Sequence, residues 1–397
     1  MELFEEFNGV SYQEWIDQIT IDLKGKDFND NLVWNSNEGI EVQPFYNRSH
    51  LKDNPLVGAT PLKQNPDWKI CETIVITSPE QTNKKALSAL KGGANSLLFI
   101  GKINTNEKMS ILLKDIMYDI VDLNFYSSNP NQIKSIAKEL SITCKSIGYD
   151  YLGELLVKGK WIKNKNQDIA DLVKLTTSDT YSLSATVKGI YYANVGTTTI
   201  QELAFSLAQG VEYMNILTDN GLTPEEASNN ISFHFGIRSN YFFEIAKLRA
   251  ARILWNLILA QYKITDGSMF IHSETSDYKQ PEKNTHLNML RGTTEAMSAI
   301  IGGCDSLSVL PYDKSIAISE RIARNVQHIL KEESFMGKVK NPADGSYYIE
   351  YLTDQITQKA WGLFKVIENK GGFISCVENG FIKSQMQPVN SLKSIEN

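Results

Sequence analysis

The amino-acid sequence predicts a (β/α)8 barrel with an N-terminal helix and an extended arm. From Trp68 onward a unit recurs in which a short apolar strand is followed by a cap residue and an amphipathic helix. Eight such units follow one another, and this alternation is typical of a parallel sheet covered by helices. A doubly wound open sheet has the same alternation, and the number of strands does not exclude it.

The first 66 residues precede the repeating units and are predicted to form a helix and an arm. Ser11 and Glu14 make a capping box that predicts a helix from residue 12 to about 23. The arm, residues 24–62, has little periodicity but is rich in apolar side chains, which a free linker lacks. These side chains are Leu32, Val33, Trp34, Phe45 and Tyr46. We therefore expect the arm to lie on a surface, either of its own chain or of a partner.

Residues 67–335 are assigned to the barrel, and residues 336–397 to a C-terminal extension with a helix at 352–369. The predicted strands span 70–77, 96–100, 120–126, 149–152, 181–188, 231–237, 269–273 and 305–310. Helix starts are predicted from cap residues and first-turn prolines, as at Ser78, Asn104, Asn129, Thr198 and Thr223. The helices at 168–176, 281–301 and 315–332 complete the pattern.

The fifth predicted strand has one large apolar face and one small hydroxyl face. Ser182, Ser184 and Thr186 alternate with larger side chains, so we expect them to face the barrel axis. The segment after this strand, residues 189–196, is predicted to be a loop and carries the pair Tyr191–Tyr192.

Composition excludes several function classes. The chain has 397 residues, a hydrophobic content of 42% and a formal net charge of −6, which provides no footprint for nucleic acid. No apolar run is long enough to span a bilayer, and the N-terminus does not resemble a signal peptide. The four cysteines are far apart and form no disulfide framework, so we expect a reducing cytoplasm.

An ordered set of motifs resembles the methylmalonyl-CoA mutase family. The run FHFGIRSNYFFEIAKLRAARILW matches a family strand and helix, and residues 291–297 and 344–348 match further motifs in the same order. The resemblance covers nearly the whole chain and is densest over residues 191–380. It implies a complex that interconverts (R)-methylmalonyl-CoA and succinyl-CoA with adenosylcobalamin, built from a catalytic and a non-catalytic chain.

Departures from the catalytic pattern identify this chain as similar to the non-catalytic small subunit. Tyr192 stands where the family has a His that touches the substrate thioester oxygen, and residues 61–68 lack an Arg-Gly-Pro-Tyr segment. No His follows an Asp by two positions, as the cobalt-ligating motif requires, and the chain ends soon after the barrel. The resemblance thus implies no catalytic residue and no cofactor in this chain.

The same resemblance implies the partner. Adenosylcobalamin would be bound by the catalytic large subunit, and the arm would wrap that subunit in a heterodimer; expressed alone, the chain can self-associate. One alternative is a catalytically competent acyl-CoA mutase barrel served by a separate cobalamin-binding protein. An unrelated barrel lyase or aldolase is the other, but no Schiff-base lysine or metal triad supports it.

Several side chains have both a functional and a structural interpretation. Tyr192 either donates a hydrogen bond to a thioester oxygen or fills a pocket with its ring, and we favour the second interpretation. The candidates for substrate binding are Tyr191, Ser182 and Ser184.

His272 and Glu274 share one face of their strand and either hold a metal or form a hydrogen-bonded pair. No third ligand is evident, so we predict no metal site and expect a buried, satisfied His234. Three cations of one helix, Lys247, Arg249 and Arg252, either bind a CoA phosphate or form a solvated or interface face, which we favour.

Overall fold

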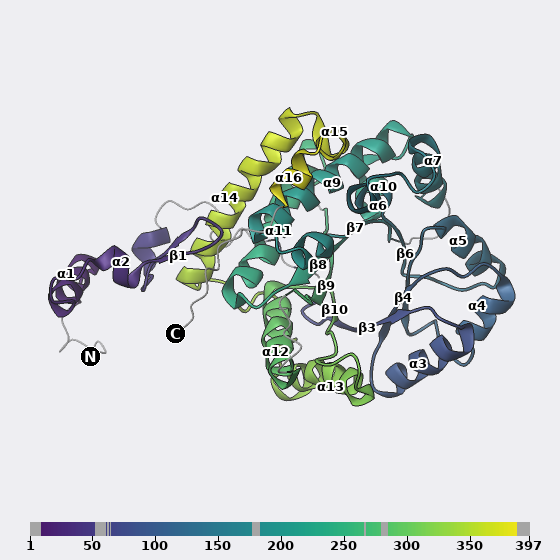
Figure 1. Ribbon diagram of the computed structural model, residues 1–397, viewed down its shortest axis with the longest axis horizontal. Helices are drawn as coiled ribbons and strands as arrows, with labels where there is room; N and C mark the ends of the chain where they lie inside the picture. The colour runs from purple at the N-terminus through teal and green to yellow at the C-terminus, as the bar shows by residue number, and fades with distance from the viewer. Residues whose placement is uncertain are drawn as a thin grey trace.

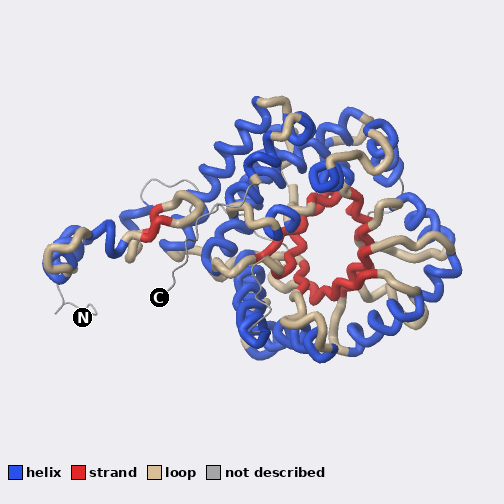
Figure 2. Tube along the Cα trace, in the orientation of Figure 1, coloured by secondary structure: helices blue, strands red, loops and turns tan. Residues whose placement is uncertain are grey.

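The repeating units close into a barrel. This computed structural model describes residues 9–51, 61, 63, 65–176, 183–265, 267–278 and 285–386. Eight parallel strands follow the order β10-β3-β4-β5-β6-β7-β8-β9, and β10 pairs with both β3 and β9. Figure 2 shows them as a ring enclosed by helices. The predicted (β/α)8 barrel is therefore confirmed, and the open doubly wound sheet is wrong.

The strands of the barrel are short and lie farther apart along the chain in its second half. They are β3 (Lys69–Val75), β4 (Ser96–Ile100), β5 (Asp122–Tyr126), β6 (Ser146–Tyr149), β7 (Leu183–Val187), β8 (Ile231–Ile237), β9 (Phe270–Thr275) and β10 (Ser306–Ser308).

Helices follow each strand and cover the outside of the ring. They are α3 (Pro79–Lys91), α4 (Asn106–Leu112), α5 (Pro130–Glu139), α6 (Tyr151–Lys158), α7 (Lys165–Thr176), α8 (Ile190–Asn194), α9 (Thr199–Asp219), α10 (Pro224–Asn229), α11 (Tyr241–Gln261), α12 (Thr285–Gly302) and α13 (Ala317–His328), with a π-helical turn at Ile329–Glu333.

Local capping explains why these helices begin where they do. The Ser78 hydroxyl accepts a hydrogen bond from the Gln81 amide, and Thr198 and Thr223 each form a complete capping box. Asn104 is not the cap of α4 as predicted, because Thr105 accepts the hydrogen bond from the first turn instead.

Two predicted boundaries near the fifth strand are wrong. The fourth strand ends at Tyr149 rather than at residue 152, because Asp150 caps helix α6 through the Gly153 amide. The predicted loop after β7 contains helix α8, which begins directly behind Gly189. Both errors matter, since the candidate site residues lie on these segments.

The arm has more structure than the sequence predicts, and Figure 1 shows it extending away from the ring. The arm contains α2 (Phe28–Leu32), a hairpin of β1 (Trp34–Asn35) with β2 (Glu41–Val42), and the 3-10 turn Arg48–Leu51. The helix predicted before it is α1 (Tyr12–Asp22), with the Ser11–Glu14 capping box in place.

Part of the arm packs on its own chain and part remains exposed. Ile40 joins the main core, and Tyr46 stacks on Tyr348 with ring centroids 5.2 Å apart. Trp34 and Phe45 keep 49% and 46% of their surface exposed in the isolated chain.

A C-terminal layer of helices packs on the outer helices of the barrel and also contacts the arm. It consists of α14 (Tyr347–Asn369), α15 (Gly372–Glu378) and α16 (Phe381–Gln385). Helix α14 packs along α11 and α9 and begins five residues earlier than predicted, at Tyr347. None of the helices in the described ranges is both long and apolar enough to cross a membrane.

Candidate functional site

Tyr192 lies on α8, at the carboxyl end of β7, where (β/α)8 enzymes place their catalytic groups. Its ring is 1% exposed and packs on Phe205 of α9, with centroids 5.3 Å apart. Its hydroxyl donates a 3.5 Å hydrogen bond to Oε1 of Gln209. The phenol therefore points outward into the helix layer, and it fills space between α8 and α9.

Asp150, which sequence reasoning missed, organises the surroundings of Tyr192. Its Oδ1 accepts hydrogen bonds from the Gln209 amide nitrogen (2.6 Å), the Tyr213 hydroxyl (2.9 Å) and the Gly153 backbone amide (2.8 Å). Burial raises the pKa of this carboxyl, and the nearby Lys188 opposes that rise. Asp150 thereby ties α6 to α9 behind the tyrosine.

The candidate substrate-binding residues separate in space. The Tyr191 hydroxyl lies 3.4 Å from Nζ of Lys188, and that Nζ lies 4.9 Å from the ring centroid of Tyr126. Ser184 is buried in β7, and Ser182 lies outside the described residues. Thr186 does face the axis as predicted, because its hydroxyl lies 3.1 Å from that of Ser232 on the next strand.

The three cations of α11 do not form a phosphate-binding cluster. All are buried, and each pairs with a different acidic residue. Lys247 pairs with Glu202 at 2.9 Å and Arg252 with Asp305 at 2.9 Å, whereas Arg249 pairs with Glu350 at 2.5 Å. The solvated or interface face favoured from sequence is wrong for the same reason, since neighbouring helices and loops enclose α11.

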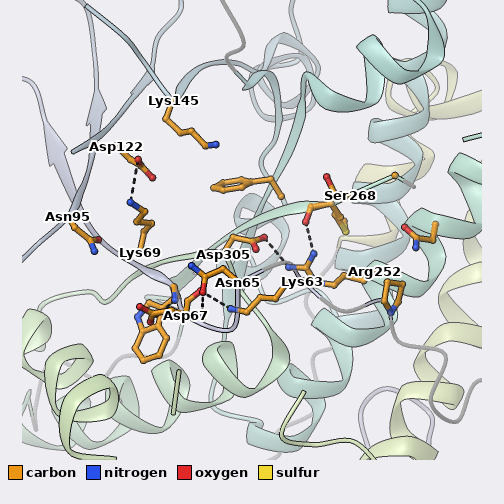
Figure 3. A pocket seen from close by; sticks show the side chains of 16 residues that line it. Lys63, Asn65, Asp67, Lys69, Asn95, Asp122, Lys145, Arg252, Ser268 and Asp305 are labelled. Carbon is orange, nitrogen blue, oxygen red and sulfur yellow. Dashed lines mark hydrogen bonds and ion pairs between the residues drawn. The ribbon is translucent and has the colours of Figure 1, made fainter. Parts of the chain in front are cut away.

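A polar pocket opens at the amino-terminal mouth of the barrel (Figure 3), where the strands begin. Its volume is about 540 Å³. Figure 3 shows Lys145 pointing into it, beside the ion pairs Lys69–Asp122 (3.5 Å) and Arg252–Asp305 (2.9 Å). The pocket lies at the mouth opposite to Tyr192.

Small polar side chains continue from this pocket along the barrel axis. A second, narrower cavity shares Asp122, Lys145 and Phe270 with the pocket and reaches His272. Its polar lining includes Ser96, Ser146, Ser232 and Ser306. The sequence prediction of small polar residues inside the barrel is confirmed.

Three buried donors meet on the axis. His234 of β8 stands beside His272 of β9 in the strand register, with ring centroids 4.5 Å apart. Nε2 of His234 lies 4.0 Å from Oε2 of Glu274. The predicted His272–Glu274 hydrogen-bonded pair is wrong, because Nδ1 of His272 bonds Ser306 and Glu274 accepts from Thr73.

Burial shifts the proton affinities of these donors. Desolvation lowers the pKa of His272 to about 4, and raises the pKa of Glu274 to about 7. The pKa of His234 is held well below its usual range by burial and by the nearby His272. Both imidazoles are therefore neutral at pH 7 and offer lone pairs.

The chain is thus a (β/α)8 barrel with polar side chains along its axis and an open pocket at the amino-terminal ends of its strands. The methylmalonyl-CoA mutase family model matches residues 102–395, and the chain belongs to that family.

Curated relatives cover most of the chain. The methylmalonyl-CoA mutase small subunit of Porphyromonas gingivalis is 37% identical over 98% of this chain and 68% of its own length. The methylmalonyl-CoA mutase of Rhizobium meliloti is 31% identical over 89% of this chain and 57% of its own length. The small subunit of Streptomyces virginiae is 29% identical over 96% of this chain and 67% of its own length. The chain therefore spans between about half and two thirds of the length of these relatives.

Proposed function

We propose that this chain is the non-catalytic small subunit of an adenosylcobalamin-dependent methylmalonyl-CoA mutase, and that it supports a catalytic large subunit. The observation that carries the proposal is Tyr192. It replaces the histidine that the family resemblance assigns to the thioester oxygen, and its hydroxyl is engaged by Gln209 in the helix layer. A group so placed does not reach a substrate on the axis.

The residues of this chain do not fit a cobalt-binding role. In the family motif a His follows an Asp by two positions, and none of the five histidines here does so. His234 and His272 lie inside the barrel, 4% and 5% exposed, where no corrin ring fits. The radical chemistry that interconverts (R)-methylmalonyl-CoA and succinyl-CoA would therefore belong to adenosylcobalamin on the large subunit.

The contribution of this chain would be an interface. Residues 1–66 are the proposed N-terminal helix and partner-wrapping arm, 67–335 the barrel and 336–397 the C-terminal helical extension. Trp34 and Phe45 are about half exposed in the isolated chain, although both are large apolar side chains. Contact with a large subunit would cover them, and obligate interfaces of this kind typically exceed about 2,000 Å². In the absence of the large subunit, the same surface supports self-association.

A second candidate function is a catalytically competent acyl-CoA mutase barrel that uses a separate cobalamin-binding protein. The open amino-terminal mouth and the small polar side chains behind it favour this alternative, because they leave part of the axis accessible. The burial of Tyr192 argues against it.

Co-expression of this chain with the catalytic large subunit from the same organism tests the proposal. The two chains should co-purify at equal stoichiometry, and mutase turnover should require the large subunit. The chain alone, with adenosylcobalamin and a separately expressed cobalamin domain, should convert no methylmalonyl-CoA. Turnover by that mixture would favour the second candidate, whereas failure to co-purify would contradict the small-subunit assignment.

A further inference from the structure

The donors on the barrel axis have a composition and an arrangement that proteins use for transition metals. One ligand atom from each of His234, His272 and Glu274 can be chosen so that all lie within 4.8 Å of one another. Two imidazoles and one carboxylate form the ligand set of many mononuclear sites, with the remaining positions left to water. This set is independent of the cobalt-binding motif and of the proposed function.

The hydrogen-bonding state of the imidazoles is a second, separate observation. Within the described part of the chain, both ring nitrogens of His234 and Nε2 of His272 have no hydrogen-bond partner. Each residue is at least nine-tenths buried. An unpaired buried polar group costs about 1–3 kcal/mol, and an ion bound by one nitrogen of each imidazole would provide a partner for two of these three atoms.

The outer contacts orient the ligands toward a common point. Nδ1 of His272 lies 3.1 Å from the Ser306 hydroxyl, which leaves Nε2 to face the cluster. The Thr73 hydroxyl donates a 3.0 Å hydrogen bond to Oε2 of Glu274. Such second contacts fix the rotamer of a ligand and raise metal affinity.

The spacing needs only a small contraction. Metal–ligand distances of about 2.1 Å in a tetrahedral site place the ligand atoms about 3.4 Å apart. The 4.0 Å between Nε2 of His234 and Oε2 of Glu274 exceeds that value by about 0.6 Å, and no pair of ligand atoms in the set is more than 4.8 Å apart. The cavity that reaches His272 adjoins the open pocket at the amino-terminal mouth, because Asp122, Lys145 and Phe270 line both, and this is the side from which an ion would enter.

Charge balance favours a divalent ion over an empty core. Glu274 supplies a negative charge that is costly to bury unless a cation compensates it. Lys188 also acts on His234 and opposes a cation there. Direct coordination at about 2.1 Å outweighs this more distant charge.

We propose that His234, His272 and Glu274 bind one divalent first-row transition-metal ion on the barrel axis. The ion would join β8 to β9 and close the axis to an acyl chain. Binding of the ion would explain why polar side chains that take no part in turnover are buried on the axis of this barrel.

Metal titration of the purified full-length chain tests this site. After removal of metals with a chelator, Zn²⁺ is added and counted by elemental analysis, and Co²⁺ is followed by its visible d–d absorption. We expect about one equivalent bound, a rise in Tm with Zn²⁺, and a Co²⁺ spectrum typical of nitrogen and oxygen ligands at low coordination number.

Variants separate this site from adventitious binding. Glu274→Gln and His234→Phe should each weaken Zn²⁺ binding by more than about tenfold, and Ser306→Ala should weaken it by about 10–100-fold through the lost orientation of His272. His286→Ala removes an exposed histidine outside the cluster and is the matched control. Circular dichroism of the metal-free variants checks that each one folds.

Two results would overturn the proposal. One is a wild-type chain that binds no stoichiometric Zn²⁺ and leaves the Co²⁺ spectrum that of the aqueous ion, which would indicate water as the occupant. The other is binding that His286→Ala weakens as much as Glu274→Gln does, or that folded His234→Phe and Glu274→Gln leave unchanged.

Discussion

Replacing Lys247 with Met removes a cation from between two buried carboxylates. Nζ of Lys247 lies 2.9 Å from Oε2 of Glu202 and 2.5 Å from Oε2 of Glu244, and it donates to the Gly236 carbonyl at 2.5 Å. The side chains of Lys247 and Glu202 have no exposed surface, and that of Glu244 has 1%. After the substitution, Arg238 is the cation that still pairs with both acids among the residues that the structure describes.

The expected loss of stability follows from this burial. Removing one partner of a buried ion pair typically costs about 3–5 kcal/mol, because the remaining charge is left without compensation. For 397 residues, an unfolding entropy of about 2.1 cal/mol/K per residue totals about 0.8 kcal/mol/K. A loss of about 4 kcal/mol therefore lowers Tm by about 5 °C.

Differential scanning calorimetry of wild type and variants measures this shift. Lys85→Met is the matched control, because the Lys85–Glu320 pair is 61% and 46% exposed and its removal should cost less than about 1 kcal/mol. Adding Glu202→Gln to Lys247→Met should recover stability by removing the uncompensated charge. The reasoning is refuted if Lys247→Met shifts Tm no more than Lys85→Met, or if the double variant is as unstable as the sum of the single ones.

Three further predictions concern activity, assembly and pH. Tyr192→His should leave the isolated chain without conversion of methylmalonyl-CoA in a coupled assay, because the ring lies in the helix layer and no histidine of the sequence follows an Asp by two positions. Detectable turnover contradicts this. Deleting residues 1–62, or replacing both Trp34 and Phe45 with Ala, should weaken binding of the large subunit by more than about tenfold in titration calorimetry, and unchanged affinity would exclude the arm as the interface. Burial raises the pKa of the Glu295 carboxyl to about 7, above its value in the unfolded chain. The free energy of unfolding of wild type should therefore fall by up to about 3 kcal/mol relative to that of Glu295→Gln as the pH rises from about 4.5 to 7. A difference in denaturation midpoint between the two proteins that is the same at both pH values would contradict this.

The candidate metal ligands were within reach of sequence reasoning, but only in part. His272 and Glu274 share a strand face by their spacing, and His234 was expected to face inward on its own strand. What joins them is the register of β8 with β9, which sets His234 opposite His272. A parallel register between strands separated by a whole helix is decided by barrel closure, and spacing along the chain does not encode it.

The sequence by itself determined the order of the eight strands and most of the helix caps, and it predicts from the family resemblance that Tyr192 stands at the position of a histidine. These features depend on neighbours within a few residues, as the Thr198–Gln201 capping box illustrates. Only the tertiary structure decided the direction of Tyr192, the separate partners of the α11 cations and the role of Asp150. Those outcomes depend on which helix packs over which strand, because burial and pairing of a polar side chain are set by groups distant in the sequence.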